Sequence, residues 1–230
     1  MREIVLDTET TGMDPEEGHR LVEIGCIELE NHMPTGRTYH QYINPERDVP
    51  AEVVAVHGLT EERLKDEPTF GEIVGDFLDF LGTDSKLVIH NAEFDMKFIN
   101  AELKPFGFPS IDKKRIVDTL WIARKKFPGS PANLDALCRR FNIDNSNRTL
   151  HGALLDSELL AEVYMELLGG RQRGLDIEVT EENKETKALE KQALTVERTY
   201  REARIFTAND DEKAAHEKML EELKDAIWKQ

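Results

Sequence analysis

The chain has 230 residues, of which 39% are hydrophobic and 33% are charged, and its formal net charge at pH 7 is -16. This length suits one domain with an appendage, and the hydrophobic share is sufficient for a packed core. The charged share and a mean hydropathy of -0.53 exclude a membrane protein. The negative charge argues against a broad basic face that binds duplex nucleic acid. Either nucleic acid is not the substrate, or only a short strand end enters a local site whose negative charge is offset by metal ions.

The N-terminal segment, the lengths of the apolar runs and the cysteines all indicate the same cellular compartment. Residues 1–7 enter a strand-like run at once and carry no signal-peptide pattern, and no apolar run approaches the roughly 18 residues that a membrane span needs. Cys26 and Cys138 each have apolar neighbours, which predicts buried thiols in a reducing compartment. We therefore expect a cytoplasmic protein.

Three strands are predicted near the N-terminus. Residues 3–7 (EIVLD) form a short apolar run, which is typical of a buried strand. Residues 21–29 and 37–43 predict two further strands, and the turn-rich segment 31–36 is expected to connect them. The three strands form a meander, followed by a loop around residues 57–58.

Strands and helices alternate in the rest of the N-terminal region. Residues 70–81 predict a helix whose buried face carries five apolar side chains, namely Phe70, Ile73, Val74, Phe77 and Leu81. Asn91 follows a strand at 87–90 and is expected to cap a helix over 92–103. The later elements are a strand at 116–118, a helix through Trp121 and Ile122 that ends near Pro128, a short helix at 133–141 and an amphipathic helix at 153–168. This order predicts an α/β fold with a ribonuclease-H-like mixed sheet flanked by helices.

The C-terminal region has a different composition. Gly169-Gly170 ends the last helix of the domain, and residues 171–195 are polar and charged, as in a flexible linker. Residues 210–229 form a second amphipathic pattern, in which Ala215, Met219, Leu223 and Ile227 are spaced by four. Such a helix has little to bury its apolar stripe against on its own. We expect a domain at 1–170, a linker at 171–198 and a helical tail at 199–230.

Acidic residues stand where the predicted elements begin or end. Asp7 and Glu9 are two apart in a strand, so their side chains project to the same face. Asp95 lies early in one helix, and Asp156 lies in the first turns of another, five residues after His151. Any one of these acids alone is more often a solvated or capping group, but together they predict a site at one edge of the sheet.

Three segments carry a family resemblance. The blocks LDTETTG at 6–12, HNAEFD at 90–95 and HGALLD at 151–156 resemble, in this order, the three motifs of the DEDD superfamily of 3′→5′ exonucleases. The similarity covers about residues 3–168 and is strongest to the epsilon family of proofreading subunits of bacterial DNA polymerase III. In the tyrosine branch of the superfamily the general base would stand at Gly152, so the sequence fits the histidine branch.

The resemblance implies roles for five residues. The metal ligands would be Asp7, Glu9, Asp95 and Asp156, and the general base would be His151. Phosphodiester hydrolysis requires an activated water and relief of charge on the phosphate and on the leaving oxygen, which two divalent ions can supply. Hard Mg²⁺ or Mn²⁺ suits a set of carboxylates, whereas zinc does not. A neutral histidine can accept a proton from water near pH 7.

The resemblance also implies a pocket for the terminal nucleotide. Its lining would be Asp7, Glu9 and Asp156 together with Thr10, Glu52, Val56, His57 and Phe94. Aromatic side chains stack on bases in single-strand sites, but a phenylalanine beside a strand end, such as Phe94, is more often a core residue. His57 is open to interpretation as a loop cap. Asp118 either extends the acidic site or, as we favour, is a buried structural carboxylate.

The tail is predicted to bind partners. Gln172 to Ile177 resembles a weak sliding-clamp motif without its usual final aromatic residue, and an ordinary linker is the alternative interpretation. The final helix, with Phe206 before it and Trp228 at its end, is expected to dock in a groove of the polymerase catalytic (alpha) subunit. Whether a small accessory subunit also binds is left open by the sequence.

The resulting prediction is a proofreading exonuclease that removes mispaired 3′-terminal nucleotides from single-stranded or frayed DNA. A tethered nuclease needs no strong electrostatic grip of its own, which accounts for the negative charge. The nearest alternative is an RNA-trimming exoribonuclease of the same superfamily, and the long C-terminal region argues against it. A non-catalytic binding protein is the other class, but all five motif residues are present.

Overall fold

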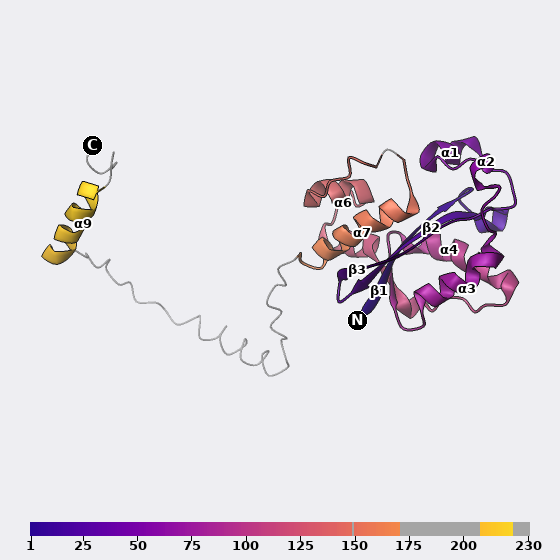
Figure 1. The fold of residues 1–230 in the computed structure, drawn as a ribbon, viewed down its shortest axis with the longest axis horizontal. Coiled ribbons are helices and arrows are strands. Elements are labelled where there is room, and N and C mark those ends of the chain that lie inside the picture. Colours follow the sequence, from indigo (N-terminus) through magenta and orange to yellow (C-terminus); the bar gives the residue numbers. More distant parts are fainter. Residues whose placement is uncertain (149, 171–207, 223–230) are drawn as a thin grey trace. The chain divides into compact units, whose positions relative to one another are not determined.

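A mixed five-stranded sheet is the centre of the N-terminal unit (Figure 1). The computed structural model describes residues 1–148, 150–170 and 208–222. These fall into two units, one within 1–176 and one within 177–230, and each is described by itself. The strands lie in the order β3-β2-β1-β4-β5, with bounds β1 (Arg2–Thr10), β2 (Leu21–Glu30), β3 (Met33–Tyr42), β4 (Lys86–Ile89) and β5 (Ile116–Asp118). The first three are antiparallel, and β4 and β5 run parallel to β1, so the predicted mixed sheet is confirmed.

The connection between β2 and β3 is shorter than the sequence suggests. Asn31 and His32 both have positive φ, 52° and 68°, and they join Glu30 directly to its partner Met33 in a two-residue turn. The predicted loop at 31–36 is therefore wrong, because β3 continues through Pro34. A proline is tolerated there since β3 is an edge strand of the sheet.

Helices cover both faces of the sheet, and alternate residues of β1 show the division. Ile4 and Leu6 pack with α3 (Phe70–Leu81) and α4 (Ala92–Leu103), whereas Val5 packs with α7 (Ala153–Leu167). The two helices α5 (Thr119–Lys126) and α6 (Leu134–Phe141) pack against α7. The predicted buried face of α3 is confirmed in all five positions, and both cysteines are buried. Short 3-10 turns occupy Pro15–Glu17, Lys104–Phe106 and Lys113–Arg115.

The segment that was expected to be a loop contains two helices. α1 (Ala51–His57) ends at Gly58, which adopts a left-handed conformation with φ 77°, and α2 (Glu61–Leu64) follows. α1 begins after Pro50 without a side-chain cap and buries only His57. A helix of seven residues with one buried side chain leaves no periodic pattern, which explains why the sequence did not predict it.

The last helix of the unit lies closer to the sheet than an amphipathic surface helix would. α7 buries nine side chains, including the polar Asp156 and Ser157. A Cβ atom at Gly25 of β2 would lie 2.2 Å from the carbonyl carbon of Ala153, so a glycine is needed for the helix to approach. Ser157 Oγ donates a hydrogen bond of 2.9 Å to the Gly25 carbonyl. Because Gly25 is paired with Asp7 in the sheet, this contact brings the start of α7 beside Asp7.

The C-terminal unit is described only over α9 (Asp210–Glu222). Ala215 and Met219 are exposed on it, as the apolar stripe predicts. Outside the described residues lie the linker at 171–198, the motif from Gln172 to Ile177, Phe206, Leu223, Ile227 and Trp228. None of the helices in the described ranges is both long enough and apolar enough to traverse a bilayer.

Candidate active site

A pocket of ≈ 240 Å³ lies at the end of β1, where β4 also ends. The carboxyl ends of parallel strands meet at one edge of a sheet, and loops and helix starts converge there. All four predicted carboxylates and the predicted histidine line this one pocket. Its lining consists of Asp7, Thr8, Glu9, His90, Asn91, Phe94, Asp95, Leu134, Arg148, His151 and Asp156.

The alternation of β1 distributes its polar residues between the two faces of the sheet. Asp7 and Glu9 share the face on which Val5 meets α7, and that helix supplies Asp156. Thr8 points to the opposite face, where its Oγ1 donates a hydrogen bond of 2.8 Å to Asp95 Oδ1 on α4. Thr8 was not predicted as a site residue, although its place between two candidate acids in a strand implies that it faces α4.

Asn91 starts α4 in a way that differs from the prediction. Its side chain makes no capping hydrogen bond, and its backbone is left-handed, with φ 65° and ψ 52°. Asparagine tolerates this conformation better than most residues. The turn sends the chain from β4 directly into α4, so Asp95 lies in the first turn of the helix and is buried. The carboxylate therefore benefits from the helix N-terminus.

Arg148 is a pocket residue that the sequence did not predict. Its guanidinium donates to both oxygens of Asp156, at 2.5 Å and 2.7 Å, and to Asp135 Oδ1 at 2.9 Å. It also donates to Nδ1 of His151 at 2.9 Å, so that nitrogen acts as an acceptor. An arginine three residues before a histidine has no recognisable motif. Contact with Asp156 is set by the tertiary fold.

His151 forms the open side of the pocket. Its side chain is 47% exposed, whereas that of Asp156 is 3% exposed, and 3.4 Å separates His151 Nδ1 from Asp156 Oδ2. The backbone N–H of His151 donates to the carbonyl of Val56 at 3.0 Å, which joins this segment to α1. The backbone of His151 is thus fixed by a hydrogen bond, while its imidazole is accessible to solvent, which a proton acceptor requires.

Burial and mutual repulsion disfavour charge on the clustered carboxyls. Burial, followed by the charges of Asp95, Glu9 and Asp156, raises the pKa of Asp7 well above its usual range. Burial is also the main reason that the pKa of Glu9 rises to about 8 and that of Asp95 to about 7. The guanidinium of Arg148 opposes this effect at Asp7 and Glu9. A set of ionised carboxylates here requires additional positive charge.

Divalent metal ions fit this donor set. One ligand atom each from Glu9, His151 and Asp156 lies within 4.8 Å of the others. Asp7 and Asp95 line the same pocket and add carboxylate oxygens. Oxygen donors with excess negative charge match hard cations such as Mg²⁺ or Mn²⁺. Asp156 is already engaged by Arg148, so a cation bound there must share this carboxylate or displace the guanidinium.

The residues predicted for the nucleotide pocket are only partly assembled. Phe94 lines the acidic pocket, but Thr10, Glu52, Val56 and His57 do not. Thr10 is buried at the end of β1, where its Oγ1 donates to the Gly12 carbonyl at 2.6 Å. Glu52 and Val56 are exposed on α1. Helix α1, which carries Glu52 and Val56, adjoins the pocket through the hydrogen bond from the His151 N–H to the Val56 carbonyl.

His57 is the buried member of this group. Its Nδ1 accepts a hydrogen bond of 3.0 Å from the Leu59 N–H, while its Nε2 has no partner within the described residues. Burial lowers the pKa of His57, with the backbone of Thr10 acting in the opposite direction. The imidazole therefore caps the turn after α1, which agrees with the loop-cap interpretation.

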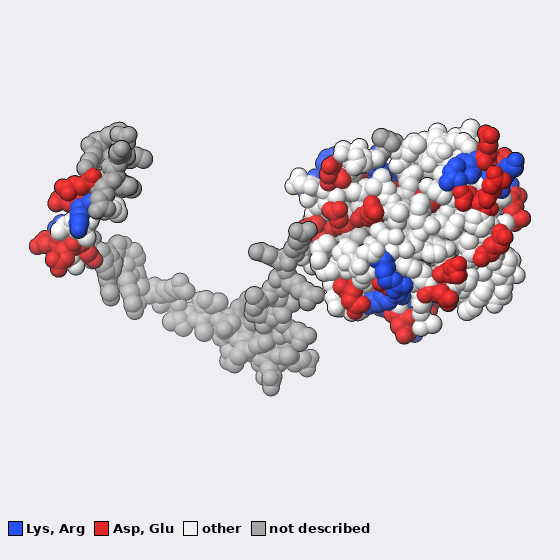
Figure 2. Space-filling view, viewed as in Figure 1, with Lys and Arg blue, Asp and Glu red and all other residues white. Residues whose placement is uncertain are grey.

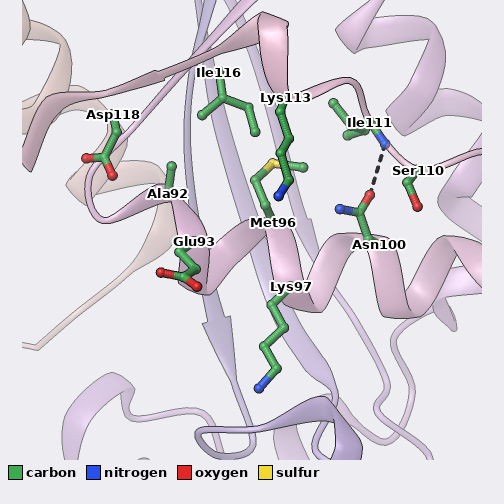
Figure 3. Close-up of a pocket in the computed structure, with 10 residues that line it drawn as sticks. All are labelled: Ala92, Glu93, Met96, Lys97, Asn100, Ser110, Ile111, Lys113, Ile116 and Asp118. Carbon is green, nitrogen blue, oxygen red and sulfur yellow. Dashed lines mark hydrogen bonds between the residues drawn. The ribbon is translucent and has the colours of Figure 1, made fainter. Parts of the chain in front are cut away.

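A larger groove of ≈ 620 Å³ lies along α4 and contains none of the four acids (Figure 3). Asp118 lines it, but the carboxylate accepts hydrogen bonds from the N–H groups of Leu120 and Trp121 and so caps α5. Asp118 therefore has a structural role, but it is half-buried and not buried as predicted. The acidic pocket, although smaller, is the one that contains the four carboxylates and the histidine.

Comparisons with known proteins agree with this geometry. The profile of the family described as "Exonuclease" matches residues 4–164. The DNA polymerase III subunit epsilon of Rickettsia conorii is 59% identical over 175 residues, which cover 75% of this chain and 76% of that protein. The subunit of the same name from Escherichia coli K12 is 44% identical over 230 residues, with 96% and 92% covered.

Solved structures share the fold. Exonuclease X in complex with 5′ overhanging duplex DNA aligns with a TM-score of 0.57 at 22% identity, covering 72% of this chain and 90% of that one. The nuclease domain of 3′hExo, described as a DEDDh family member bound to rAMP, aligns with a TM-score of 0.60 at 21% identity and covers 73% and 91%.

Proposed function

Because this chain belongs to the exonuclease family and is a 3′→5′ proofreading exonuclease, we propose that it removes mispaired 3′-terminal nucleotides from DNA with two divalent metal ions and a histidine base. The observation that carries this mechanism is the convergence of four carboxylates and one histidine in a single pocket. The similarity to the Escherichia coli subunit extends over 96% of the chain, so it includes the C-terminal region.

Asp7, Glu9, Asp95 and Asp156 would hold the ions. When bound, Mg²⁺ or Mn²⁺ would activate a water and stabilise the charge on the phosphate and on the leaving 3′ oxygen. The protein's contribution is a rigid donor set, since Asp95 is fixed by Thr8 and Asp156 by the packing of α7 on Gly25. Arg148 then becomes available to a substrate phosphate once a cation takes over Asp156.

His151 would accept the proton of the attacking water. The hydrogen bond from Arg148 requires an unprotonated Nδ1, so a neutral imidazole carries its proton on Nε2, and Nδ1 would accept the proton of water once Arg148 has moved to the substrate phosphate. Its exposed side chain can reach a water at the mouth of the pocket, and general-base catalysis requires such reach before it requires a tuned pKa. Asp156 Oδ2, 3.4 Å from Nδ1, would stabilise the imidazolium that forms.

The terminal nucleotide would lie between Phe94 and α1. Phe94 offers a ring inside the pocket, and Nε2 of His57 is a buried polar atom of a side chain whose pKa is lowered by burial and, in part, by His151. Val56 adds an exposed apolar side chain and Glu52 an acceptor. A single unpaired nucleotide fits such a pocket better than a base pair does, so frayed, mispaired ends would be favoured.

The tail would deliver the nuclease to its substrate. The relatives are named as subunits of DNA polymerase III, and we propose that this chain binds the catalytic subunit of its polymerase through the region that contains α9. Exposed Met219 on that helix is consistent with docking in an apolar groove. Tethering raises the local concentration of 3′ ends, which a chain of net charge -16 would otherwise repel. Clamp binding through Gln172 to Ile177 and an accessory subunit stay predictions.

The mechanism is tested by digestion of 5′-labelled single-stranded DNA and of matched RNA, with Mg²⁺ or with EDTA. We expect metal-dependent shortening of DNA from its 3′ end. His151→Ala should lower the rate by about 10²- to 10⁴-fold, while His216→Ala, a change of an exposed histidine in α9, should not. Faster shortening of RNA would support the exoribonuclease alternative. An unchanged rate in His151→Ala would refute the histidine base.

A further inference from the structure

The distribution of charge along the chain is uneven around the candidate site. Residues 104–151 contain ten of the thirty Lys and Arg residues but four of the forty-six Asp and Glu residues. This segment therefore carries a formal charge of +6 within a chain of -16. On the face of the nuclease unit that Figure 2 shows, acidic side chains are widely spread and the basic ones lie in a few groups among them. Two helices of this segment, α5 and α6, start at the acidic pocket, and positive charge beside such a pocket is expected of a guide for a polyanion.

The helices of this basic segment begin at the pocket. Thr119, the first residue of α5, lies 2.9 Å from His90 Nδ1 through its Oγ1, and His90 lines the pocket. Leu134, the first residue of α6, lines the pocket itself. A strand that leaves the pocket on this side meets the first turn of α5 at once.

That first turn exposes a tryptophan. Trp121 is 62% exposed, and Lys125, one turn later on the same face, places its Nζ 5.1 Å from the centre of the indole ring. Arg124 and Lys125 are exposed, and neither forms an ion pair within the part of the chain that the structure describes. Large exposed aromatics flanked by unpaired cations are the means by which proteins stack bases and bind phosphates of single strands.

The other route from the pocket is less suitable. The groove of Figure 3 presents the carboxylates of Glu93 and Asp118 at one end, where a strand would enter. Its Lys97 is already paired with Asp14, with 2.6 Å between Nζ and Oδ2. Lys113 also lines this groove, but none of the lining side chains that the structure describes is aromatic, whereas the outer face of α5 offers an exposed indole beside two cations.

From these observations we infer that the exposed face of α5, formed by Trp121, Arg124 and Lys125, binds the single-stranded DNA that lies upstream of the terminal nucleotide. Trp121 stacks on a base, and the two cations contact phosphates. This inference rests on the proposed function, because it assumes that the 3′ end occupies the acidic pocket. This face would bind single-stranded DNA irrespective of its base sequence, although the net charge of the whole chain is negative.

Two substrates distinguish strand binding at α5 from hydrolysis in the acidic pocket. The nitrophenyl ester of thymidine 5′-phosphate reaches only the acidic pocket, and a longer single strand also reaches α5. In the full chain, Trp121→Ala is expected to raise KM for the single strand by about 5- to 100-fold and to leave hydrolysis of the ester unchanged. Trp121→Phe should restore most of the affinity. Met33→Ala, which removes another exposed apolar side chain on the far hairpin, serves as the matched control.

A binding measurement tests the same contact without catalysis. Trp121 and Trp228 are the two tryptophans of the chain, so Trp228→Phe leaves Trp121 as the sole indole. Its fluorescence should be quenched as single-stranded DNA is added in EDTA, and Lys125→Glu should weaken the quenching, whereas Lys65→Glu should not. Each lost phosphate contact lowers the salt dependence of binding by about 0.7 in the log-log slope.

The outcomes are distinct. Equal KM values of Trp121→Ala and the unchanged chain on the single strand would overturn the inference alone. Loss of polymerase binding in Trp121→Ala, with DNA affinity retained, would also overturn it and assign the face to a protein partner. Failure of the unchanged chain to hydrolyse either substrate would overturn the proposed function together with the inference.

Discussion

The two sides of the acidic pocket are built in different ways. On the side of α4, Asp95 is buried and held by one neutral hydrogen bond from Thr8, which is itself part of a central strand. On the opposite side, Asp156 is held by the charged side chain of Arg148, which lies on the irregular segment before α7. A neutral bond within the core keeps a ligand in place at all times. The ion pair with Arg148 holds Asp156 in place only until a divalent metal ion binds this carboxylate.

This difference indicates how the site tolerates the absence of metal. The strand side is preorganised, and burial there disfavours the charged form of the carboxyls, as their raised pKa values indicate. The loop side carries its own counterion, Arg148, whose charge opposes the rise in pKa of Asp7 and Glu9. Each of the following changes weakens one side or the other.

The largest effect is expected from the strand side. Asp7→Ala removes a carboxylate that all the other acids surround, and we expect hydrolysis of single-stranded DNA to fall to background in Mg²⁺ with the fold intact. Circular dichroism and a nuclease assay check both parts. Asp79→Ala, at an exposed position of α3, is the control. Substantial residual activity in Asp7→Ala would contradict the ligand assignment.

A smaller effect is expected when the carboxylate stays but its support is lost. Thr8→Val preserves the shape of the side chain and removes the hydrogen bond to Asp95, leaving the carboxylate free to rotate. Loss of a supporting bond to a metal ligand typically costs 10- to 100-fold in affinity or activity, and Mg²⁺ titration of the nuclease rate measures it. Thr8→Ser should recover most of the loss. If Thr8→Val matches the unchanged chain at all Mg²⁺ concentrations, the Thr8 bond has no role.

The pKa values predict a pH-dependent stability of the metal-free protein. Glu9 and Asp95 have folded pKa values of about 8 and about 7, above 4.5 and 3.8 in the unfolded chain. The folded state therefore binds more protons between these limits, and its stability falls as pH rises through them. In EDTA, the Tm at pH 9 should be lower than at pH 6, by on the order of 5 °C.

Two controls sharpen that measurement. Mg²⁺ should largely remove the pH dependence, because a bound cation replaces the missing positive charge. Glu9→Gln should reduce it in EDTA, because the amide does not titrate. A Tm that rises from pH 6 to pH 9 in EDTA would mean that the carboxyls are not destabilised by burial.

The smallest effect on catalysis is expected from the tail. Truncation after Gly170 removes α9 and leaves both sides of the pocket complete. We expect the rate on free single-stranded DNA to change by less than about two-fold, since tethering alters effective concentration and not chemistry, whereas co-elution with the polymerase catalytic subunit should be lost. Co-elution of the truncated chain would refute polymerase binding through the tail.

The sequence predicts the strand side of the site far better than the loop side. Asp7 and Glu9 lie on β1 and Asp95 follows β4, two strands whose apolar runs are visible in the sequence, and α3 shows its core face in full. The turn at Asn31-His32 was missed because Pro34 and Gly36 look like loop residues unless β3 is known to be an edge strand. The position of Arg148 depends on contacts with Asp135 and Asp156 that only the tertiary fold creates.

The close approach of α7 to β2 has a genetic consequence. Gly25 has no functional group and takes no part in the chemistry, yet any side chain there would meet the Ala153 backbone and shift Asp156 away from Asp7. In a screen for strains with an elevated mutation rate, replacements at this glycine should therefore appear among those at the metal ligands. A position would then be essential for replication fidelity because of the space it leaves empty.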